Sequence, residues 1–305
     1  MTARVGAPEP VAVVLDPGAR TTIQDLGRPG HAHLGVPPSG AADRASFTLG
    51  NRLVGNTEDA PALETTLRGP SLRLLRAATL VLTGAPVDAT LGGRPLAMHA
   101  PFAARPGDDL VIGAATRGLR TYLAVRGGLL AERTLGSVSH DELTGLGTAV
   151  LQPGDALHVD RLALDAPAVD VAPLRAPAAN PTLRVVLGPR DDWFAPDALT
   201  ALLTESFGVT DRVNRIGARL AGPALIPRDD AQLRSEGVAA GSLQVPPSGD
   251  PILLMADHPT TGGYPVIAVV IDEDLPLAAQ LRPGDRIRFA RVARRPQAPD
   301  TDRLP

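Results

Sequence analysis

Short apolar runs bounded by Gly, Pro or Asp recur along the chain, and they predict a protein built mainly of β-strands. The predicted strands are Val11–Leu15, Thr79–Thr83, Leu110–Ile112, Tyr122–Val125, Leu183–Leu187, Ile252–Met255 and Val266–Ile271. Because these strands are closely spaced and helices are few, the pattern favours barrel-like β lobes over a doubly wound α/β sheet.

Helical patterning is confined to a few segments. Asp43 is a suitable N-cap for a helix over Arg44–Val54. A second helix is predicted for Pro196–Phe207, with its proline in the first turn. Two further segments, Arg212–Leu220 and Leu275–Leu281, fit short helices.

Two sequence repeats indicate that the chain consists of two related lobes. The pentapeptide Val-Pro-Pro-Ser-Gly occurs at Val36–Gly40 and again at Val245–Gly249. The tripeptide Pro-Gly-Asp occurs at Pro106–Asp108, Pro153–Asp155 and Pro283–Asp285, each time followed by alternating apolar residues. Repeated turns that lead into repeated strands are typical of internal duplication. Such a protein often places its site where the lobes meet.

A proline-rich segment separates the two predicted lobes. Residues 161–181 contain several prolines among Ala, Asp and Val, with a period of neither 2 nor 3.6, so we interpret them as a linker. The predicted division is an N-terminal lobe over 1–160, the linker, and a second lobe over 182–293. The charged, proline-rich tail over 294–305 is expected to be flexible.

Composition and charge exclude several classes of protein. The 305 residues suffice to bury a core, and 44% hydrophobic with 21% charged residues is ordinary for a globular protein. A net charge of −3 gives no field for nucleic acid or an anionic membrane. No stretch reaches the roughly 18 apolar residues of a membrane helix. Met1–Pro10 lacks the apolar part of a secretion signal, so a cytoplasmic location is expected.

The chain contains neither Cys nor Lys, and all 30 basic residues are Arg. Without Cys, thiolate nucleophiles, disulfides and iron–sulfur clusters are excluded. Without Lys, this chain forms no Schiff base, has no Walker-type phosphate loop and carries no covalently attached biotin. It also lacks a Gly-x-Ser-x-Gly elbow, so the sequence does not indicate a serine-hydrolase triad.

The richest polar segment of the first lobe is Thr21–Asp43. Its glycines permit close backbone approach, so this loop is suited to wrapping a ligand. Asp25 is a candidate acid or base, and Arg28 is a candidate for bidentate contact with an anion. The alternative is a long loop held by Asp–Arg pairs and side-chain-to-backbone bonds. His31 and His33 have no clear third ligand after them, so we predict no metal site.

Further polar candidates lie in both lobes. Glu64 interrupts an apolar segment and is either a strand-face carboxylate facing a cleft or ordinary solvated surface. Asp257–Pro265 contains a Thr-Thr-Gly-Gly turn whose N–H groups and hydroxyls suit an anion-binding nest. Arg215 and Arg219 are four residues apart and would share one face of a helix. The alternative is a structural turn with two solvated arginines.

Several motifs resemble those of one known family. They are Thr21–Arg28, Gly35–Asp43, Asn51–Asn56, Tyr122–Gly128, Gly188–Asp191, Asp257–Pro265 and Leu281–Asp285. These segments are similar to the allophanate hydrolase subunit 2 family, also called the biotin-dependent carboxyltransferase or KipI-antagonist family. The similarity extends from about Val11 to Arg291. Prokaryotic members of this family include the C component of the ATP-dependent 5-oxoprolinase.

The resemblance implies two cyclophilin-like β-barrel lobes related by duplication. It also implies partners: a subunit 1-like protein (the B component) and a LamB/YcsF-like protein (the A component). With them, the chain would act as a hydrolase on a cyclic amide, using ATP to open the lactam of 5-oxoproline to glutamate. The alternatives are a carboxyltransferase subunit of a biotin-dependent urea or amide carboxylase, or a non-catalytic KipI-antagonist-type regulatory subunit. The absence of a biotin-carboxylase or carrier segment from this sequence favours the first.

One segment departs from the family pattern. After Leu135-Gly136-Ser137 the family leads us to expect Arg-Ser-Thr, whereas this chain has Val138-Ser139-His140. The missing Arg removes a candidate anion contact and leaves open whether this chain is active.

Opening a lactam with ATP requires the protein to neutralise phosphate and oxyanion charge. From residue chemistry and motif position, we assign anion contact to Arg28, Arg215 and the Thr260–Gly263 turn, which includes Thr261. The candidates for proton transfer or cation contact are Asp25, Asp43 and Asp257. The remaining candidates for substrate or anion binding are Gln24, Ser39, Glu64, Gln244 and Tyr264. We expect the loops that carry Arg28 and Tyr264 to face each other across a crevice between the lobes.

Overall fold

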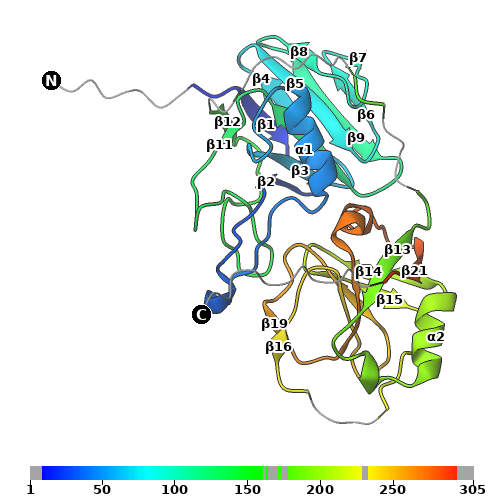
Figure 1. Cartoon of the computed structure of the whole chain (residues 1–305). Helices are drawn as coiled ribbons and strands as arrows, with labels where there is room; N and C mark the ends of the chain where they lie inside the picture. Colours follow the sequence, from blue (N-terminus) through cyan, green and yellow to red (C-terminus); the bar gives the residue numbers. More distant parts are fainter. Residues whose placement is uncertain (1–8, 161–162, 164–170, 174–177, 229–232, 294–305) are drawn as a thin grey trace.

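The computed structural model describes residues 9–160, 163, 171–173, 178–228 and 233–293. They form two β lobes, which lie one above the other in Figure 1. Strands β1 to β12 belong to the upper lobe and β13 to β21 to the lower one. The predicted linker over 161–181 lies mostly outside the described residues and the predicted tail over 294–305 lies wholly outside them, so that division of the chain stays a prediction.

The N-terminal lobe consists of two facing sheets. The seven-stranded sheet has the order β11-β12-β1-β4-β9-β6-β7, and the five-stranded sheet has the order β2-β3-β10-β5-β8. The strands of the first sheet are β1 (Ala12–Asp16), β4 (Ser71–Leu74), β6 (Val87–Leu91), β7 (Arg94–Pro95), β9 (Asp109–Ala115), β11 (Leu129–Leu130) and β12 (Ala156–Val159). Those of the second are β2 (Thr21–Gln24), β3 (Ala62–Thr66), β5 (Ala78–Gly84), β8 (Phe102–Ala104) and β10 (Arg120–Val125).

The five-stranded sheet is buried on both faces. Along β10, Leu123 faces the core between the sheets, whereas Tyr122 points to the opposite side, as the period of a strand requires. Helix α1 (Arg44–Leu53) covers that opposite side, where Phe47 packs edge-on against Tyr122 with ring centroids 6.0 Å apart. Asp43 caps α1 as the sequence predicts, accepting a hydrogen bond from the Ser46 N–H at 2.9 Å.

The second lobe is a closed barrel with the strand order β13-β20-β17-β18-β15-β14-β21. Its strands are β13 (Thr182–Leu187), β14 (Phe207–Val213), β15 (Gly217–Ala221), β17 (Ser242–Gln244), β18 (Ile252–Leu254), β20 (Val266–Val270) and β21 (Arg286–Arg291). Helix α2 (Pro196–Thr204) packs on the barrel through Leu202. A separate ribbon pairs β16 (Glu236–Gly237) with β19 (Thr261–Gly262). The prediction of a mainly β chain with few short helices is therefore confirmed.

The Pro-Gly-Asp repeats adopt the same turn at all three positions. The glycine φ angles are 89°, 91° and 91° at Gly107, Gly154 and Gly284, a region that favours glycine. Each Asp carboxylate accepts a hydrogen bond from the N–H of the residue just before the proline, at 2.7, 2.8 and 2.8 Å. The turns lead into β9, β12 and β21, so the repeated turn-strand unit exists in both lobes.

The predicted helix over Arg212–Leu220 is wrong, because this segment forms the β14–β15 hairpin. The Asn214 side chain accepts hydrogen bonds from the N–H groups of Ile216 and Gly217 at 2.9 and 3.0 Å, which favours a turn over a helix. As a consequence, Arg215 is buried and Arg219 is exposed, and they do not share a helical face.

The other two predicted helices are shorter than expected. Helix α2 ends at Thr204, since Phe207 already begins β14. The segment predicted as Leu275–Leu281 is α-helical only over α3 (Leu275–Ala278), which follows a 3-10 turn, η3 (Asp272–Asp274). Two further 3-10 turns are η1 (Ala32–Leu34) and η2 (Asp191–Trp193). Among the described residues, none of the helices is long and apolar enough to span a membrane.

Gln280, just after α3, joins the lobes. Its carbonyl oxygen accepts hydrogen bonds from the N–H groups of Leu119 and Arg120 at 2.8 and 2.9 Å. Its amide nitrogen donates to Asp43 Oδ2 at 2.7 Å and to the Arg120 carbonyl at 3.0 Å. All these groups are buried, so the Gln280 side chain provides hydrogen-bond partners both for backbone groups at the start of β10 and for the Asp43 carboxylate that caps α1.

Replacing Gln280 by Ala is therefore expected to lower the free energy of unfolding by about 1–3 kcal/mol, because buried N–H groups and a buried carboxylate lose their partner. Urea unfolding followed by circular dichroism measures this difference. The matched control is Gln152→Ala, which removes an exposed glutamine and is expected to have little effect. Equal effects of the two substitutions would contradict the role assigned to Gln280.

Candidate functional site

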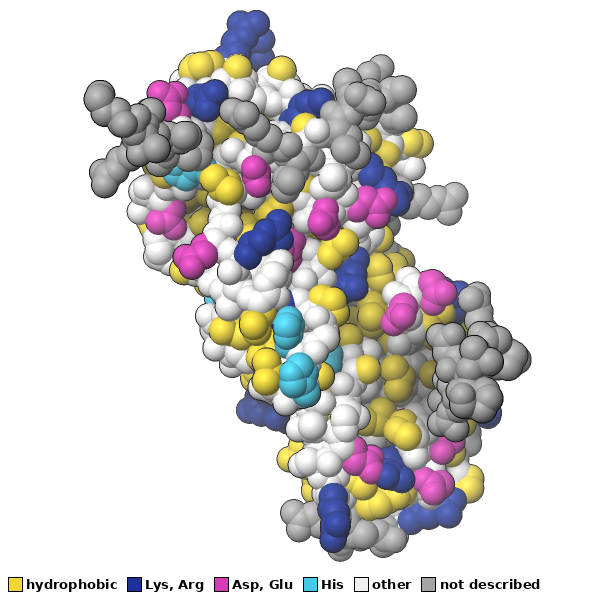
Figure 2. Space-filling model, turned by 60° about the vertical axis from the view of Figure 1, so that its left-hand side comes forward, with side chains coloured by type: hydrophobic (Ala, Val, Ile, Leu, Met, Phe, Trp, Pro, Cys, Tyr) yellow, Lys and Arg dark blue, Asp and Glu magenta, His cyan; other side chains and the backbone are white. Residues whose placement is uncertain are grey.

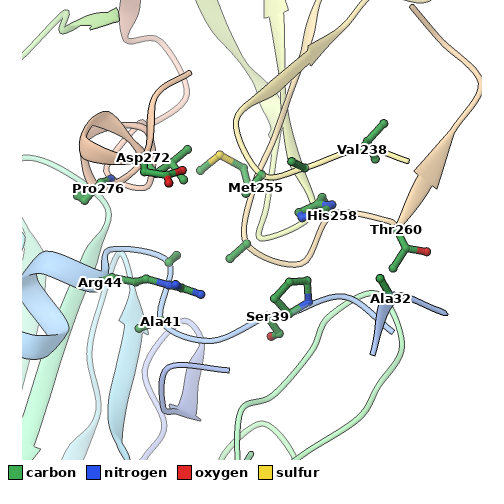
Figure 3. A pocket seen from close by; sticks show the side chains of 16 residues that line it. Ala32, Ser39, Ala41, Arg44, Val238, Met255, His258, Thr260, Asp272 and Pro276 are labelled. Atoms are coloured by element: carbon green, nitrogen blue, oxygen red, sulfur yellow. The ribbon is translucent and has the colours of Figure 1, made fainter. Parts of the chain in front are cut away.

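A cavity of about 420 Å³ lies between the two lobes. The N-terminal lobe contributes Ala32, Pro38, Ser39, Ala41, Ala42 and Arg44. The second lobe contributes Val238, Ala239, Ala240, Met255, Ala256, His258, Thr260, Asp272, Leu275 and Pro276. Figure 2 shows hydrophobic side chains gathered in the hollow between the lobes, and Figure 3 shows the two walls from close by. A mostly apolar hollow of this size with a few polar groups is typical of a small-molecule site.

The loop between β2 and α1 forms the N-terminal wall. The Arg28 N–H donates to the Pro38 carbonyl at 2.7 Å, and the Ala41 N–H donates to the Asp25 carbonyl at 2.8 Å. Ser39 and Gly40 adopt positive φ angles of 54° and 91°, so the first Val-Pro-Pro-Ser-Gly copy makes a left-handed turn against the second lobe. The wall is therefore a braced loop rather than a free one.

A buried ion network connects the lobes beside this wall. The Arg215 guanidinium donates to Asp257 Oδ2 and Oδ1 at 2.7 and 2.8 Å and to Glu64 Oε1 at 2.6 Å. It also donates to the Gly40 carbonyl at 2.6 Å. The Ser39 hydroxyl completes the network by donating to Asp257 Oδ1 at 2.6 Å. Arg215 and Glu64 are each 2% exposed, and Asp257 is fully buried.

Glu64 accepts hydrogen bonds from four different residues. Besides Arg215, Arg120 donates to Oε1 at 3.0 Å, and the Tyr122 hydroxyl and the Ala42 N–H donate to Oε2 at 2.8 and 2.9 Å. Register explains the cluster, because Tyr122 pairs with Glu64 across β10 and β3 on the face that α1 covers. The suggestion that Glu64 is solvated surface is wrong.

The network sets the protonation state of its members. Burial by itself would raise the pKa of Glu64, but Arg215 and Arg120 outweigh burial and lower that pKa to about 2. Burial likewise opposes the charge of Arg215, yet Glu64 and Asp257 raise its pKa above the ordinary value. For Tyr122, burial and then the nearby Glu64 charge raise the pKa well above 10.0. At neutral pH, Glu64 and Arg215 are thus both charged.

The structure places the remaining predicted residues of the Arg28 loop away from the cavity. Asp25 accepts hydrogen bonds from the hydroxyls of Ser137 and Ser139 at 2.5 and 2.6 Å and from the Val138 N–H at 2.9 Å. Arg28 donates to the carbonyls of Thr134 and Ser139. These contacts brace the loop against residues 134–139, which is the structural alternative that composition left open.

The side chains of Gln24 and Asp43 also form hydrogen bonds inside the protein, away from the cavity. The Gln24 amide donates to the His140 carbonyl and the Thr22 hydroxyl, both at 3.0 Å. Asp43 caps α1 and accepts from Gln280. Burial raises the pKa of Asp43, against the opposing hydrogen bonds from Gln280 and Ser46. Neither residue lines the cavity, and a catalytic role for Asp25 or Asp43 stays a prediction without support from this geometry.

The geometry gives the predicted anion nest at Thr260–Gly263 no support, and an anion-binding role for this turn stays a prediction. Thr261 and Gly262 form an extended strand, β19, that pairs with β16, so their N–H groups do not converge on one point. A Cβ atom at position 262 would lie 2.3 Å from the Gln244 amide nitrogen, so a larger residue there would displace the Gln244 side chain. Gln244 in turn donates to the Tyr264 carbonyl at 3.3 Å, and the Tyr264 side chain is 45% exposed. Of this turn, Thr260 alone lines the cavity.

The Val138-Ser139-His140 segment lies behind the cavity wall. Val138 is 1% exposed and belongs to the core between the two sheets. Ser139 holds Asp25, and the His140 carbonyl accepts from Ser39 at 3.2 Å. None of these residues lines the cavity, so the departure from the family pattern changes the support of the loop and not a cavity contact.

Several residues of the site were not singled out from the sequence. His258 stands within a segment that was, but Arg44 and Asp272 carried no motif of their own. Figure 3 shows Arg44 and Asp272 on opposite walls, at the start of α1 and in η3 respectively. Among the described residues, no carboxylate pairs with Arg44, which donates only to the Leu26 carbonyl at 3.3 Å. The position of Arg44 directly after the Asp43 cap was the one available signal.

The described part of the chain holds no group of three or more His, Asp or Glu residues placed to bind a metal ion. His31 and His33 flank and enter the short turn η1 rather than a strand. The polar side-chain groups that line the cavity are a guanidinium, an imidazole, a carboxylate and two hydroxyls.

The match to a family model gives the class of this two-lobed protein, which is that of the carboxyltransferases. The model of the carboxyltransferase domain, subdomains A and B, matches residues 34–291, and the chain belongs to this family. It is 34% identical over 283 residues to the C component of 5-oxoprolinase from Haemophilus influenzae, a match that covers 92% of this chain and 91% of that protein. The C component from Escherichia coli is 33% identical with the same coverage.

The chain is also similar to parts of larger proteins. It is 34% identical over 308 residues to urea amidolyase of Saccharomyces cerevisiae but spans 17% of that protein. Among solved structures, TTHA0988 superposes with a TM-score of 0.85 at 37% identity, covering 93% of this chain and 57% of that one. Urea amidolyase of K. lactis gives a TM-score of 0.84 at 31% identity, with 94% and 19% covered.

Proposed function

We propose that this chain is the C component of an ATP-dependent 5-oxoprolinase complex that opens the lactam of 5-oxoproline to glutamate. The observation that carries the proposal is the reciprocal match: the similarity to the 5-oxoprolinase C component covers more than nine-tenths of both chains, whereas urea amidolyase is matched over 17% of its length. The proposed partners are a subunit 1-like B component and a LamB/YcsF-like A component, in a cytoplasmic complex.

The cavity suits 5-oxoproline chemically. This substrate has a carboxylate, a ring N–H donor, a carbonyl acceptor and apolar ring methylenes. Arg44 offers an unpaired guanidinium for the carboxylate, and the hydroxyl of Thr260 is a donor for the carbonyl oxygen. Ala41, Ala240 and Met255 give apolar surface for the methylenes. The carboxylate, the carbonyl and the methylenes of the substrate thus each have a complementary group in the wall.

ATP is a second substrate of the proposed reaction. Transfer of its γ-phosphoryl group to the lactam oxygen turns a poor electrophile into a reactive one, so that water can add and the ring C–N bond can break. The cavity has one Arg and, across from it, the carboxylate of Asp272, a pattern that fits one small anion better than a triphosphate. We therefore place the nucleotide within the complex so that only its γ-phosphoryl group reaches this cavity.

The test is reconstitution. The chain is copurified with its two partners, the subunit 1-like and the LamB/YcsF-like proteins, and glutamate release from 5-oxoproline is measured with and without ATP. ATP-dependent release is expected, and no release from the assembled complex would defeat the proposal. Carboxylation of urea or another amide with an added biotin carrier would instead support the alternative that the urea amidolyase similarity favours. Binding to a histidine-kinase inhibitor with neither activity would support a KipI-antagonist role.

Within the active complex, Arg44→Met is expected to raise KM for 5-oxoproline about 10- to 100-fold, because a charge-assisted hydrogen bond to the carboxylate is lost. Initial rates over a range of 5-oxoproline concentrations give KM and kcat. Arg52→Met is the matched control, since Arg52 lies on the same helix but pairs with Glu58 on the surface. An unchanged KM in the Arg44 variant would contradict the proposed contact between Arg44 and the substrate carboxylate.

A further inference from the structure

The two ring nitrogens of His258 differ: Nδ1 has a hydrogen-bond partner and Nε2 has none among the described residues. Its Nδ1 lies 2.7 Å from the Pro259 carbonyl oxygen. Because a carbonyl oxygen only accepts, Nδ1 carries the proton, and in the neutral ring Nε2 carries the lone pair. Among the described residues, none provides a hydrogen-bond partner for Nε2. The tautomer is thus set by the backbone of the adjacent residue.

The free nitrogen belongs to a buried ring in the cavity wall. His258 is 4% exposed and lines the cavity. Figure 3 shows its ring between Met255 and Thr260, facing the loop that carries Ser39. Nε2 is not one of the buried side-chain atoms without a partner, so it is open to the cavity and free to accept from a ligand. The cavity is therefore prepared for a ligand with an N–H or O–H group.

Burial favours the neutral form of the ring. Burial lowers the pKa of His258, against the hydrogen bond to Pro259 and the opposing charges of Asp257 and Asp141. The charge of Asp257 is already neutralised by Arg215. The other charged groups of the cavity wall are Arg44 and Asp272, which have opposite signs. At neutral pH the ring is consequently an acceptor and a base rather than a cation.

The other predicted proton-transfer groups are already engaged. Asp257 has both oxygens occupied by Arg215, Ser39 and the Glu142 N–H. Asp25 and Asp43 are saturated away from the cavity. Among the described residues that line the cavity, the titratable groups are Arg44, His258 and Asp272, and Asp272 is exposed. His258 is the buried base of this set.

We propose that His258 Nε2 accepts the N–H of an amide-type substrate and takes its proton. The inference rests on the proposed function and deepens it. When the lactam oxygen attacks the γ-phosphorus of a nucleoside triphosphate, the O–P bond forms, the bond to the nucleoside diphosphate breaks, and the ring N–H proton moves to Nε2. Water then adds to the former carbonyl carbon, and the proton returns to the ring nitrogen as the C–N bond breaks, which leaves an acyl phosphate. A second water cleaves this acyl phosphate to glutamate and inorganic phosphate. Without that acceptor, positive charge would build up on the amide.

The first test reads the tautomer directly. Nitrogen-15 NMR of the isolated, uniformly labelled chain, with His258→Asn for assignment, is expected to show a protonated Nδ1 and an unprotonated Nε2 at pH 7. The ring is expected to titrate below the ordinary value of about 6.5. A proton on Nε2, or a ring already charged at pH 7, would overturn the proposal whether or not the complex is active.

The second test uses the assembled complex. His258→Gln is expected to lower kcat by about 10²- to 10⁴-fold with little change in KM, because an amide at the Nε2 position accepts a hydrogen bond but does not take a proton. In the wild-type complex, kcat/KM is expected to fall as the pH drops through the His258 pKa. This fall on the acid side of the pH profile should be absent in the variant. His33→Asn, an exposed histidine outside the cavity, is the matched control.

The outcomes separate the two proposals. A wild-type complex without 5-oxoproline turnover would defeat the proposed function, while the NMR result still decides the state of His258. An active complex in which the folded His258→Gln variant keeps its kcat, or keeps the same acid limb, would overturn the role of His258 alone. Circular dichroism and the unfolding midpoint of the variant establish that it is folded.

Discussion

Replacing Arg215 by Met is expected to lower the free energy of unfolding by about 3–5 kcal/mol, the typical cost of removing one partner from a buried ion pair. The substitution leaves Glu64 and Asp257 buried without their shared counter-charge and removes the donor to the Gly40 carbonyl. Because Glu64 and Gly40 belong to the first lobe and Asp257 to the second, the loss is also expected to loosen the junction that encloses the cavity.

Urea unfolding monitored by circular dichroism measures this loss. The matched control is Arg219→Met, four residues later on the exposed face of β15, which is expected to change the stability by less than about 0.5 kcal/mol. Neutralising the stranded carboxylates by Glu64→Gln and Asp257→Asn in the Arg215→Met background should restore part of the stability. An Arg215 variant as stable as the control would show that the network does not hold the lobes.

The stability of the wild-type protein is expected to fall by about 3 kcal/mol between pH 4.5 and about 2 through Glu64 alone. Its pKa is about 2 in the folded protein and 4.5 ordinarily, so the unfolded chain takes up the proton first as the pH falls. The stabilisation is complete above 4.5 and is lost as the pH drops toward 2. Arg215 and Arg120 are the physical cause, since they favour the ionised carboxylate.

The difference between wild type and Glu64→Gln isolates this contribution. Both proteins share the other acidic groups, so subtracting their unfolding free energies at each pH removes the common part. The variant is expected to lose less stability than wild type between pH 4.5 and 2. Glu58→Gln serves as control, because Glu58 forms a surface pair with Arg52 that is 51% exposed on the glutamate side. Parallel curves for wild type and Glu64→Gln would contradict an ionised Glu64 in the folded state.

Local signals were sufficient for the seven predicted strands and for the Pro-Gly-Asp turns. The Pro-Gly-Asp motif encodes its own geometry, because proline fixes one φ, glycine supplies the positive φ, and the Asp side chain closes the turn. The helix predicted over Arg212–Leu220 failed for an equally local reason. The Asn214 side chain competes for the backbone N–H groups that a helix would need.

The structure brings the predicted segments to one cavity but turns several of the predicted side chains away from it. The β2–α1 loop and the segment that begins at Asp257 do form facing walls of one cavity. Within them, Asp25 and Arg28 turn toward residues 134–139, whereas Arg44 and His258 face the cavity. The type of a residue does not reveal the direction of its side chain when the backbone is an irregular loop.

By itself, the sequence determined seven of the strands, the repeated turns and the family, because each depends on residues that are near one another in the chain. The tertiary structure alone decided that Glu64, Arg215 and Asp257 share one buried network and that His258 keeps a free nitrogen toward the cavity. Burial and long-range pairing set these features, since a charge is held inside the protein only where a distant segment supplies its partner.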